Sequence, residues 1–316
     1  MKDLSDSSSH EINEPAMRSY LSLLIIILTA SGMSLHKGRK TPAPLGTPPG
    51  VVAIDSNFYV DLTETTNFNW MEYMYWTKKV FGEQSAEYKA TILDSMIWEK
   101  EACLSNHERL YFGHPVYRHY PVTCVSQQQA EAYCKWRSDR VFEYYLVREK
   151  IIAFQMEQTP ENHFTIEHYF EGRFNNTAPH PGIKSYPVYR LPTADEWKKA
   201  VQFSDSAYLQ ASESKRFMKK HGLANANRAL IGIAICDGPY FSQEPTQETE
   251  FNGLIPTDLY GNVSEWLSVP NTVIGGSWKE KSREECTQPK IVKGAADHVG
   301  FRCVCEMKDY KIGQTF

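Results

Sequence analysis

The sequence predicts an α+β fold in which short, irregular strands are combined with a few helices. The chain of 316 residues is 41% apolar and 13% aromatic, which is enough for a sizeable core with many flat packing surfaces. Two capping boxes mark the starts of helices in the first two thirds of the chain. From about residue 225 onward, Gly, Pro and Asn turns separate short apolar stretches, which is typical of short strands.

The first expected elements are a strand over residues 57–62 and a helix over residues 67–81, with Thr66 or Asn67 available to cap the helix. The clearest helix begins after Ser126, which forms a capping box with Gln129. Its apolar residues fall near one face at helical spacing, namely Ala130, Tyr133, Cys134, Val141 and Tyr144.

A second capping box, residues 193–196, follows Pro192 and predicts another helix from Trp197. No internal repeat is visible, and the sequence lacks the glycine-rich phosphate loops and the common hydrolase and zinc-protease motifs.

The N-terminal region, residues 1–35, carries the most apolar run of the chain at 21–30. The run is preceded by Arg18 and followed by small residues, as in a signal peptide, whereas the acidic and Ser-rich residues before Met17 do not fit one. Translation from Met17 would remove this conflict. The pattern predicts export to the periplasm or cell envelope, with a retained membrane anchor or a buried segment as the alternatives.

The remaining organisation follows from composition. Residues 36–50 are rich in Pro and Gly and form a linker, residues 51–310 form the folded domain, and 311–316 are a tail. Met33 stands where a lipoprotein would need a cysteine, so lipidation is unsupported. The net charge of −4, without a basic stripe, argues against a nucleic-acid partner.

The seven cysteines allow at most three bridges in an exported protein and leave one thiol free. Cys303 and Cys305 alternate along an expected strand, so they are a weak metal signal. Cys286 follows Glu280, Glu284 and Glu285, whose charges disfavour a thiolate and raise the pKa of the thiol.

Five separated stretches form one pattern in order: 58–67 (FYVDLTETTN), 120–136 (YPVTCVSQQQAEAYCKW), 189–197 (YRLPTADEW), 258–266 (DLYGNVSEW), and 275–278 (GGSW) followed by 298–303 (HVGFRC). In this order they resemble the formylglycine-generating enzyme and sulfatase-modifying factor family. The resemblance implies a C-type-lectin-like α+β fold over roughly residues 57–304.

The resemblance implies a structural calcium ion at residues 258–265. Asp258 and Glu265 would bind it by their side chains, and Gly261 and Val263 by their carbonyl oxygens, a hard oxygen cage that suits Ca²⁺. The alternative is an ordinary turn whose polar residues tie the loop together.

The resemblance also implies a disulfide between Cys134 and Cys303, because the family joins the cysteines of these two motifs. An oxidising compartment would favour the bridge, and two buried thiols are the alternative.

Active family members bind copper(I) through two cysteines spaced by four residues. The corresponding positions here are Glu280 and Glu285, and Cys286 misses the second by one residue. Carboxylates are poor hosts for Cu(I), so copper binding and the family's oxidation chemistry are not expected. If a rebuilt site exists, the residues that map near the ancestral cleft are Trp278, Glu280, Cys286 and Arg302.

A second enzymatic branch, the sulfoxide synthases, uses iron bound by histidines. The pairs His114 with His119 and His163 with His168 lack a carboxylate facing both histidines, so iron chemistry is unsupported.

A third branch, the gliding-motility lipoproteins, is similar in residues 136–146 and in the cysteine-free 275–280 loop. Its members are non-catalytic envelope scaffolds. The insertion at 148–185 suits either a lobe for a protein or glycan partner or a decoration that packs on its own domain. Two hypotheses follow: a non-catalytic envelope scaffold or binding protein, and an oxidase-like enzyme with a rebuilt site.

Overall fold

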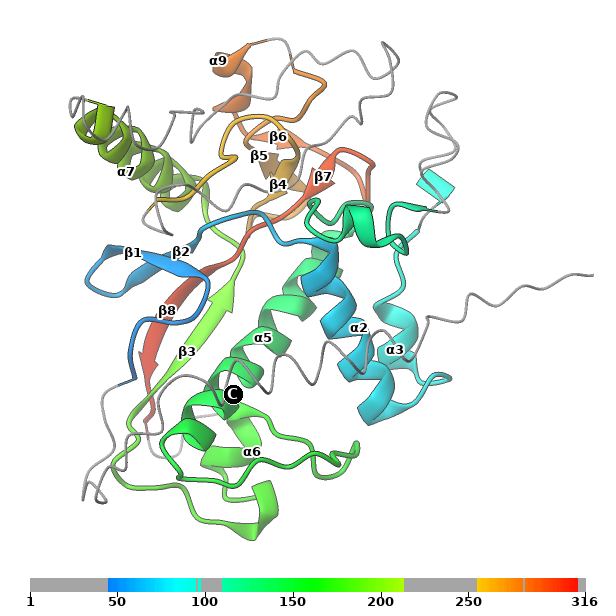
Figure 1. Ribbon diagram of the computed structural model, residues 1–316, viewed down its shortest axis with the longest axis vertical. Helices are drawn as coiled ribbons and strands as arrows, with labels where there is room; N and C mark the ends of the chain where they lie inside the picture. Colours follow the sequence, from blue (N-terminus) through cyan, green and yellow to red (C-terminus); the bar gives the residue numbers. More distant parts are fainter. Residues whose placement is uncertain (1–44, 95, 98–109, 213–254, 281, 312–316) are drawn as a thin grey trace, which may run out of the picture. The chain divides into compact units, whose positions relative to one another are not determined.

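A four-stranded sheet with a long helix packed along it forms the centre of the fold (Figure 1). The computed structural model describes residues 45–94, 96–97, 110–212, 255–280 and 282–311, all within the unit Pro44–Phe316. The strand order across the sheet is β1 (Val51–Asp55), β2 (Phe58–Asp61), β8 (Val304–Asp309) and β3 (Ser185–Arg190). Both β2 and β3 pair antiparallel with β8, so a strand near the C-terminus is central.

A second sheet of very short strands carries the loops that form the candidate site. Its order is β6 (Lys290–Ile291), β5 (Thr272–Ile274), β4 (Ser264–Trp266) and β7 (Val299–Gly300). The β4–β7 pair is parallel and the other two pairs are antiparallel. Strands of two or three residues separated by turns agree with the predicted irregular α+β fold.

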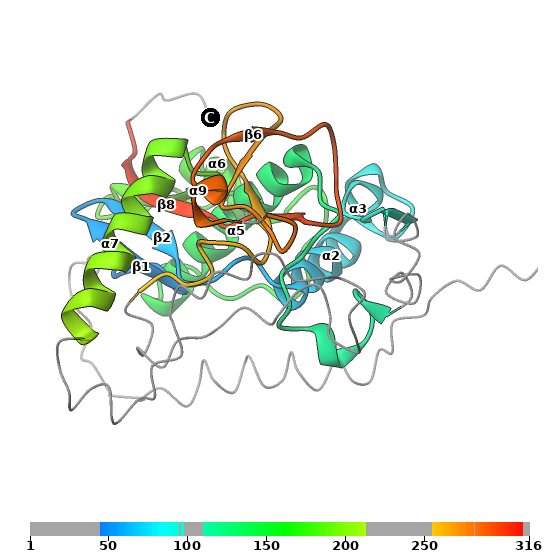
Figure 2. The ribbon, with the colours of Figure 1, turned by 90° about the horizontal axis from the view of Figure 1, so that it is seen from above.

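Three long helices surround the first sheet: α2 (Asn67–Phe81), α5 (Gln127–Arg148) and α7 (Ala194–Ser212). The short helices are α3 (Ala86–Ala90), α6 (Ile166–Phe170), α9 (Arg283–Cys286), and the 3₁₀ turns η2 (Pro115–Tyr117) and η3 (Phe174–Asn176). Figure 2 shows α7 and the α2–α3 pair on opposite sides of α5. None of the helices in the described part of the chain is long and apolar enough to cross a membrane.

The predicted helix starts are confirmed by their caps. Thr66 and Ser126 each accept a bond from the third helical backbone N–H and receive the reciprocal bond at their own N–H, which completes the capping boxes of α2 and α5. The helix expected from Trp197 begins three residues earlier, at Ala194. Thr193 is itself the cap, because it accepts the N–H of Glu196 at 3.2 Å.

The main core lies between α2, α5 and the two sheets. Trp70 and Tyr133 stack with ring centroids 5.7 Å apart, and Phe301 meets both rings edge-on. These rings are among the most buried in the chain. Aromatic packing of this kind stabilises a fold whose strands are too short to do so alone.

The insertion at 148–185 packs on its own domain, one of the two alternatives left open by the sequence. Phe142 of α5 stacks on Phe170 of α6 at 5.6 Å, and both are buried with the surrounding insertion residues. Asp139 accepts the backbone N–H of Ile166 at 2.8 Å. The insertion is therefore anchored to α5 through an apolar cluster and a buried polar bond.

Candidate functional site

The loop after β5 carries the Gly-Gly-Ser-Trp stretch, residues 275–278. Gly276 has a φ of +71°, and a Cβ there would lie 2.4 Å from the Sγ of Cys286. The adjacent Gly275 N–H donates to the carbonyl oxygen of Cys286 at 3.0 Å. At position 276 only glycine satisfies both the left-handed backbone and this close approach. The loop and α9 therefore pack directly on each other.

Glu280 closes this loop from inside. Its carboxylate accepts the Ser277 hydroxyl at 2.8 Å and the Ser277 backbone N–H. Lys290 of β6 donates to its other oxygen at 2.8 Å. Burial opposes the charge, but the bonds from Lys290 and Ser277 hold the pKa of Glu280 below its ordinary value. At the first copper-cysteine position the protein thus has an ionised, fully engaged carboxylate.

Cys286 is buried beneath the loop, and its thiol donates to the carbonyl oxygen of Ser282 at 3.4 Å. Burial and the charge of Glu280 raise the pKa of Cys286 to about 11. At neutral pH the thiolate needed for nucleophilic attack or copper binding is therefore scarce. Glu285, at the second copper-cysteine position, is exposed on α9.

A second ion pair braces the same loop. Lys279 contacts both carboxylate oxygens of Asp297, at 2.9 and 2.8 Å, and His298 Nδ1 lies 2.7 Å from Asp297 Oδ1. Burial opposes ionisation, yet the bonds from His298 and Lys279 lower the pKa of Asp297. Sequence reasoning missed Asp297, and its position just before the 298–303 motif was the available signal.

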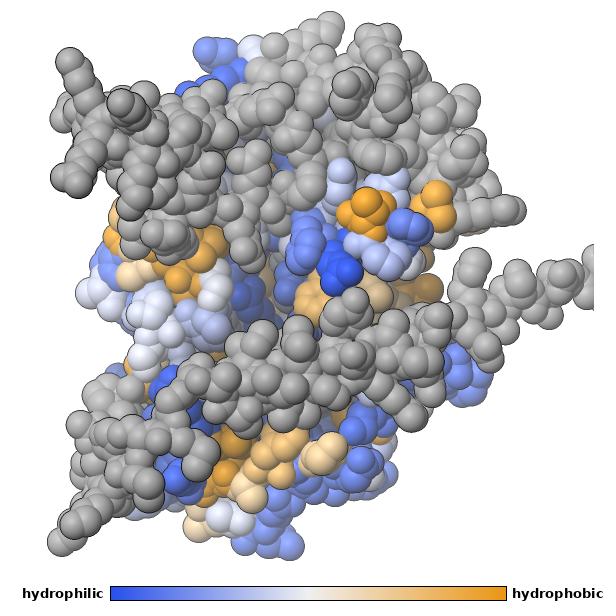
Figure 3. All heavy atoms as spheres, in the orientation of Figure 1, coloured by the Kyte–Doolittle hydropathy of each residue, from blue (hydrophilic) through white to orange (hydrophobic). Residues whose placement is uncertain are grey.

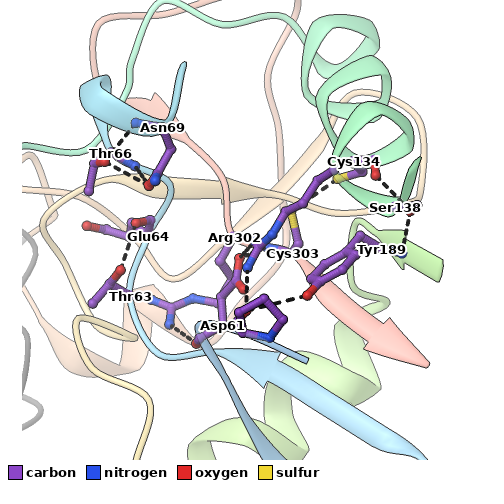
Figure 4. A network of polar contacts seen from close by, with 12 residues as sticks. Asp61, Thr63, Glu64, Thr66, Asn69, Cys134, Ser138, Tyr189, Arg302 and Cys303 are labelled. Atoms are coloured by element: carbon purple, nitrogen blue, oxygen red, sulfur yellow. Dashed lines mark hydrogen bonds and ion pairs between the residues drawn. The ribbon is translucent and has the colours of Figure 1, made fainter. Parts of the chain in front are cut away.

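Arg302 lies in a separate network at the centre of the fold (Figure 4), with 1% of its surface exposed. Its Nε is 2.7 Å from Glu265 Oε1, and its Nη2 donates to the carbonyl oxygen of Thr257 at 2.7 Å. Its Nη1 donates to the carbonyl oxygen of Asp61 at 3.2 Å. The indole of Trp197 donates to Glu265 Oε2 at 3.1 Å. Arg302 therefore holds β2, β4 and the 257–258 loop together.

Glu64 is a buried carboxylate of the same region that sequence reasoning did not single out. It accepts bonds from Asn262 Nδ2 at 2.6 Å and from the backbone N–H of Val263 at 3.3 Å. Burial, together with the nearby Asp258 carboxylate, raises the pKa of Glu64 well above its ordinary value. Its only signal was its place in the polar stretch that follows the first predicted strand.

The residues expected to bind calcium lie together and are buried, with Asp258 and Gly261 in left-handed turns. Both oxygens of Glu265 are engaged, one by Arg302 and one by Trp197. A calcium ion bound by Glu265 would have to displace these bonds. Among the described residues, no group of three His, Cys, Asp or Glu side chains is placed to hold a metal ion. The calcium site stays a prediction.

The structure brings the predicted cysteine pair together in the core. The Sγ atoms of Cys134 on α5 and Cys303 lie 3.3 Å apart, as two thiols in contact. Burial and the neighbouring Cys303 raise the pKa of Cys134 well above its ordinary value. Asp61 accepts the Cys303 N–H at 2.9 Å and pairs with Arg137 at 2.7 Å (Figure 4). The two residues are in contact as expected, and their oxidation to a disulfide stays a prediction.

The four cleft candidates fall into two places. Glu280 and Cys286 share the loop after β5, and Trp278 is fully buried beside it against Tyr111 and Val263. Arg302 belongs to the separate buried network with Glu265. Trp278 and Arg302 are therefore structural residues of the core.

Comparison with known proteins defines the class. The sulfatase-modifying factor enzyme 1-like domain model matches residues 25–307. The chain therefore belongs to the sulfatase-modifying factor enzyme 1-like family, and its mixed fold of short strands and a few helices is the fold of that family. The match begins inside the apolar run at 21–30 and includes the segment expected to be a linker.

Two solved structures are similar in fold. The structure of CarF is 16% identical, covers 85% of this chain and 96% of its own, and has a TM-score of 0.39. Treponema denticola variable protein 1 is 14% identical, covers 84% of this chain and 94% of its own, and has a TM-score of 0.36. A search of curated proteins finds no match.

Proposed function

We propose that this chain is a non-catalytic member of its family that works as a scaffold or binding protein of the cell envelope. The observation that carries the proposal is the state of the two copper-cysteine positions. Glu280 is tied to Ser277 and Lys290, and Glu285 is exposed on α9. The thiol nearest to them is buried and has a pKa of about 11. Cu(I) selects soft thiolates, and these side chains do not supply a pair.

The rest of the proposal extends this to location and partners. The apolar run at 21–30 supports export and membrane association. The likeness of residues 136–146 and of the cysteine-free loop to gliding-motility lipoproteins favours an envelope scaffold with a protein or glycan partner. The alternative is an oxidase-like enzyme of the same family whose site has been rebuilt around Cys286.

Copper titration separates these two functions. The purified full chain is titrated with Cu(I) against a competing chelator, and free thiols are counted in the same sample before and after unfolding. We expect no stoichiometric copper and a Cys286 thiol that reacts only on unfolding. The matched control is Cys286→Ser, which should give the same copper curve. A one-to-one copper signal that disappears in Cys286→Ser would establish the oxidase-like alternative.

A further inference from the structure

We propose that the loop after α5, residues 149–157, is a membrane-contact surface that rests on the lipid headgroup and acyl-chain boundary. It is named here the α5 exit loop. Phe154 is 60% exposed and Met156 is 61% exposed, and the neighbouring Ala153 is also exposed. Large apolar side chains gathered at a loop tip indicate a surface that is covered in use.

The loop is held in this shape by the fold. The backbone N–H groups of Ile151 and Ile152 both donate to the carbonyl oxygen of Leu146, at 2.8 and 3.4 Å. Their side chains pack inward against the insertion cluster. From the other side, Lys79 at the end of α2 donates to the carbonyl oxygen of Met156 at 2.8 Å. The apolar tip is therefore presented by anchored backbone at both ends.

The charges around the tip fit a lipid surface. Arg148 and Lys150 precede the apolar tip and are exposed, and Lys79 lies beside it. Glu149 pairs with Arg148, and Glu157 pairs with Lys79. Apolar tips flanked by long basic side chains insert at the interface while the cations remain at the headgroups. Figure 3 shows hydrophobic surface gathered on the lower part of this face, where Figure 1 draws α6.

The chain enters the domain at this same end of α5. Leu45 packs against the cluster that also covers Ile151 and Ile152, and Tyr145 donates to the carbonyl oxygen of Gly46 at 2.9 Å. Residues 1–44 precede this point and include the apolar run at 21–30. The fourteen residues from 31 to 44 can span about 40 Å if extended as a Pro-rich linker. The run and the loop can therefore reach one membrane.

The opposite end of α5 supplies a matched control. Ile92 is 51% exposed and Val269 is 52% exposed. Gln129 and Gln127, at the start of α5, donate to their carbonyl oxygens at 3.0 and 3.1 Å. A helix of 22 residues is about 33 Å long, so these side chains lie far from the exit loop. They have similar exposure and should make no contact with the same membrane.

The test is vesicle binding by the full chain, measured as partitioning to neutral phosphatidylcholine vesicles and to vesicles that also contain an anionic lipid. It is run in the native background and with Ile25, Ile26 and Ile27 changed to Gln, so that the apolar run does not mask the loop. In the second background, Phe154→Ser/Met156→Ser should weaken partitioning about tenfold on both vesicle types. Ile92→Ser/Val269→Ser should change it less than about twofold, since those residues stay in water.

Equal partitioning of the exit-loop variant and its parent in the Gln background would overturn the proposal, and would leave a protein partner for this patch. Equal losses in the exit-loop and control variants would overturn it as well, because the effect would not be local. The inference rests on the envelope location in the proposed function. Its failure is distinguishable, since the copper and thiol result does not depend on vesicles.

Discussion

Gly276 shows how single residues define this site. Its φ of +71° and the 2.4 Å approach of Cys286 Sγ leave no room for a side chain. Gly276→Ala should therefore cost about 2–4 kcal/mol of unfolding free energy, measured by urea denaturation. Gly294→Ala is the control, because Gly294 has a φ of +80° but no neighbouring atom within 4 Å of the place that a Cβ would take. Equal costs at the two glycines would contradict the close packing of the loop on α9.

Arg302 is the second residue whose environment predicts a large effect. Replacing it by Leu leaves the buried Glu265 carboxylate without its cation, and burial of an unpaired charge is strongly unfavourable. We expect Arg302→Leu to lower the unfolding free energy by about 3–5 kcal/mol in chemical denaturation. Glu265→Gln, which keeps hydrogen-bonding groups toward Arg302 and Trp197, should cost clearly less. A mild Arg302→Leu would show that the ion pair is not essential to the core.

Among the elements, α5 carries the attachment of the insertion, and Asp139 makes it depend on pH. Burial, opposed by the Ile166 N–H and by Arg140, raises the pKa of Asp139 from 3.8 to about 6. Lys135 also favours the charged form, and Glu143 disfavours it. The folded protein holds this proton more tightly than the unfolded chain. The stability from this group is complete below pH 3.8 and is lost as the pH rises to about 6.

Asp139→Asn should remove that loss, because an amide oxygen can still accept the Ile166 N–H without titrating. At pH 7.5 we expect the variant to be more stable than the parent by up to about 3 kcal/mol, and the difference should vanish near pH 4. Thermal unfolding across this pH range measures it. A variant that is less stable than the parent at pH 7.5 would show that the ionised carboxylate strengthens the attachment.

At the same scale, the elements with local signals were predictable from the sequence. The helices α2, α5 and α7 are indicated by their caps, because a Thr or Ser side chain satisfies N–H groups within four residues of itself. The β4–β7 pairing has no such signal, since it joins Glu265 to Gly300 across 35 residues of sequence (265 to 300). Strands this short are specified by tertiary packing, which local patterns do not contain.

For the whole molecule, Cys134 and Cys303 join α5 to the strand region at the end of the domain. We expect both thiols to be protected in protein exported to an oxidising compartment and free in protein made in the cytosol. The bridge should add about 2–4 kcal/mol to the unfolding free energy, and Cys134→Ser should abolish the difference. Cys305→Ser is the control. Reaction of Cys134 and Cys303 with a thiol reagent in the unfolded exported protein would contradict the bridge.

The candidate site was predictable only in part, for a physical reason. The family motifs locate Glu280, Glu285 and Cys286, and the acidic neighbours indicate the raised pKa of the Cys286 thiol. Nothing local indicates that Lys290 pairs with Glu280, or that Lys279 pairs with Asp297. These ion pairs join residues from different loops, and only the fold brings them to 2.8 Å.

The central claim is that this chain lacks the oxidation chemistry of its active relatives. The most direct test incubates the purified full chain with Cu(I), oxygen and a cysteine-containing peptide, and follows the peptide cysteine by mass spectrometry. The account predicts no aldehyde product above the level of Cu(I) alone, and no change in Cys286→Ser. Conversion of the peptide cysteine to formylglycine that is lost in Cys286→Ser would contradict it.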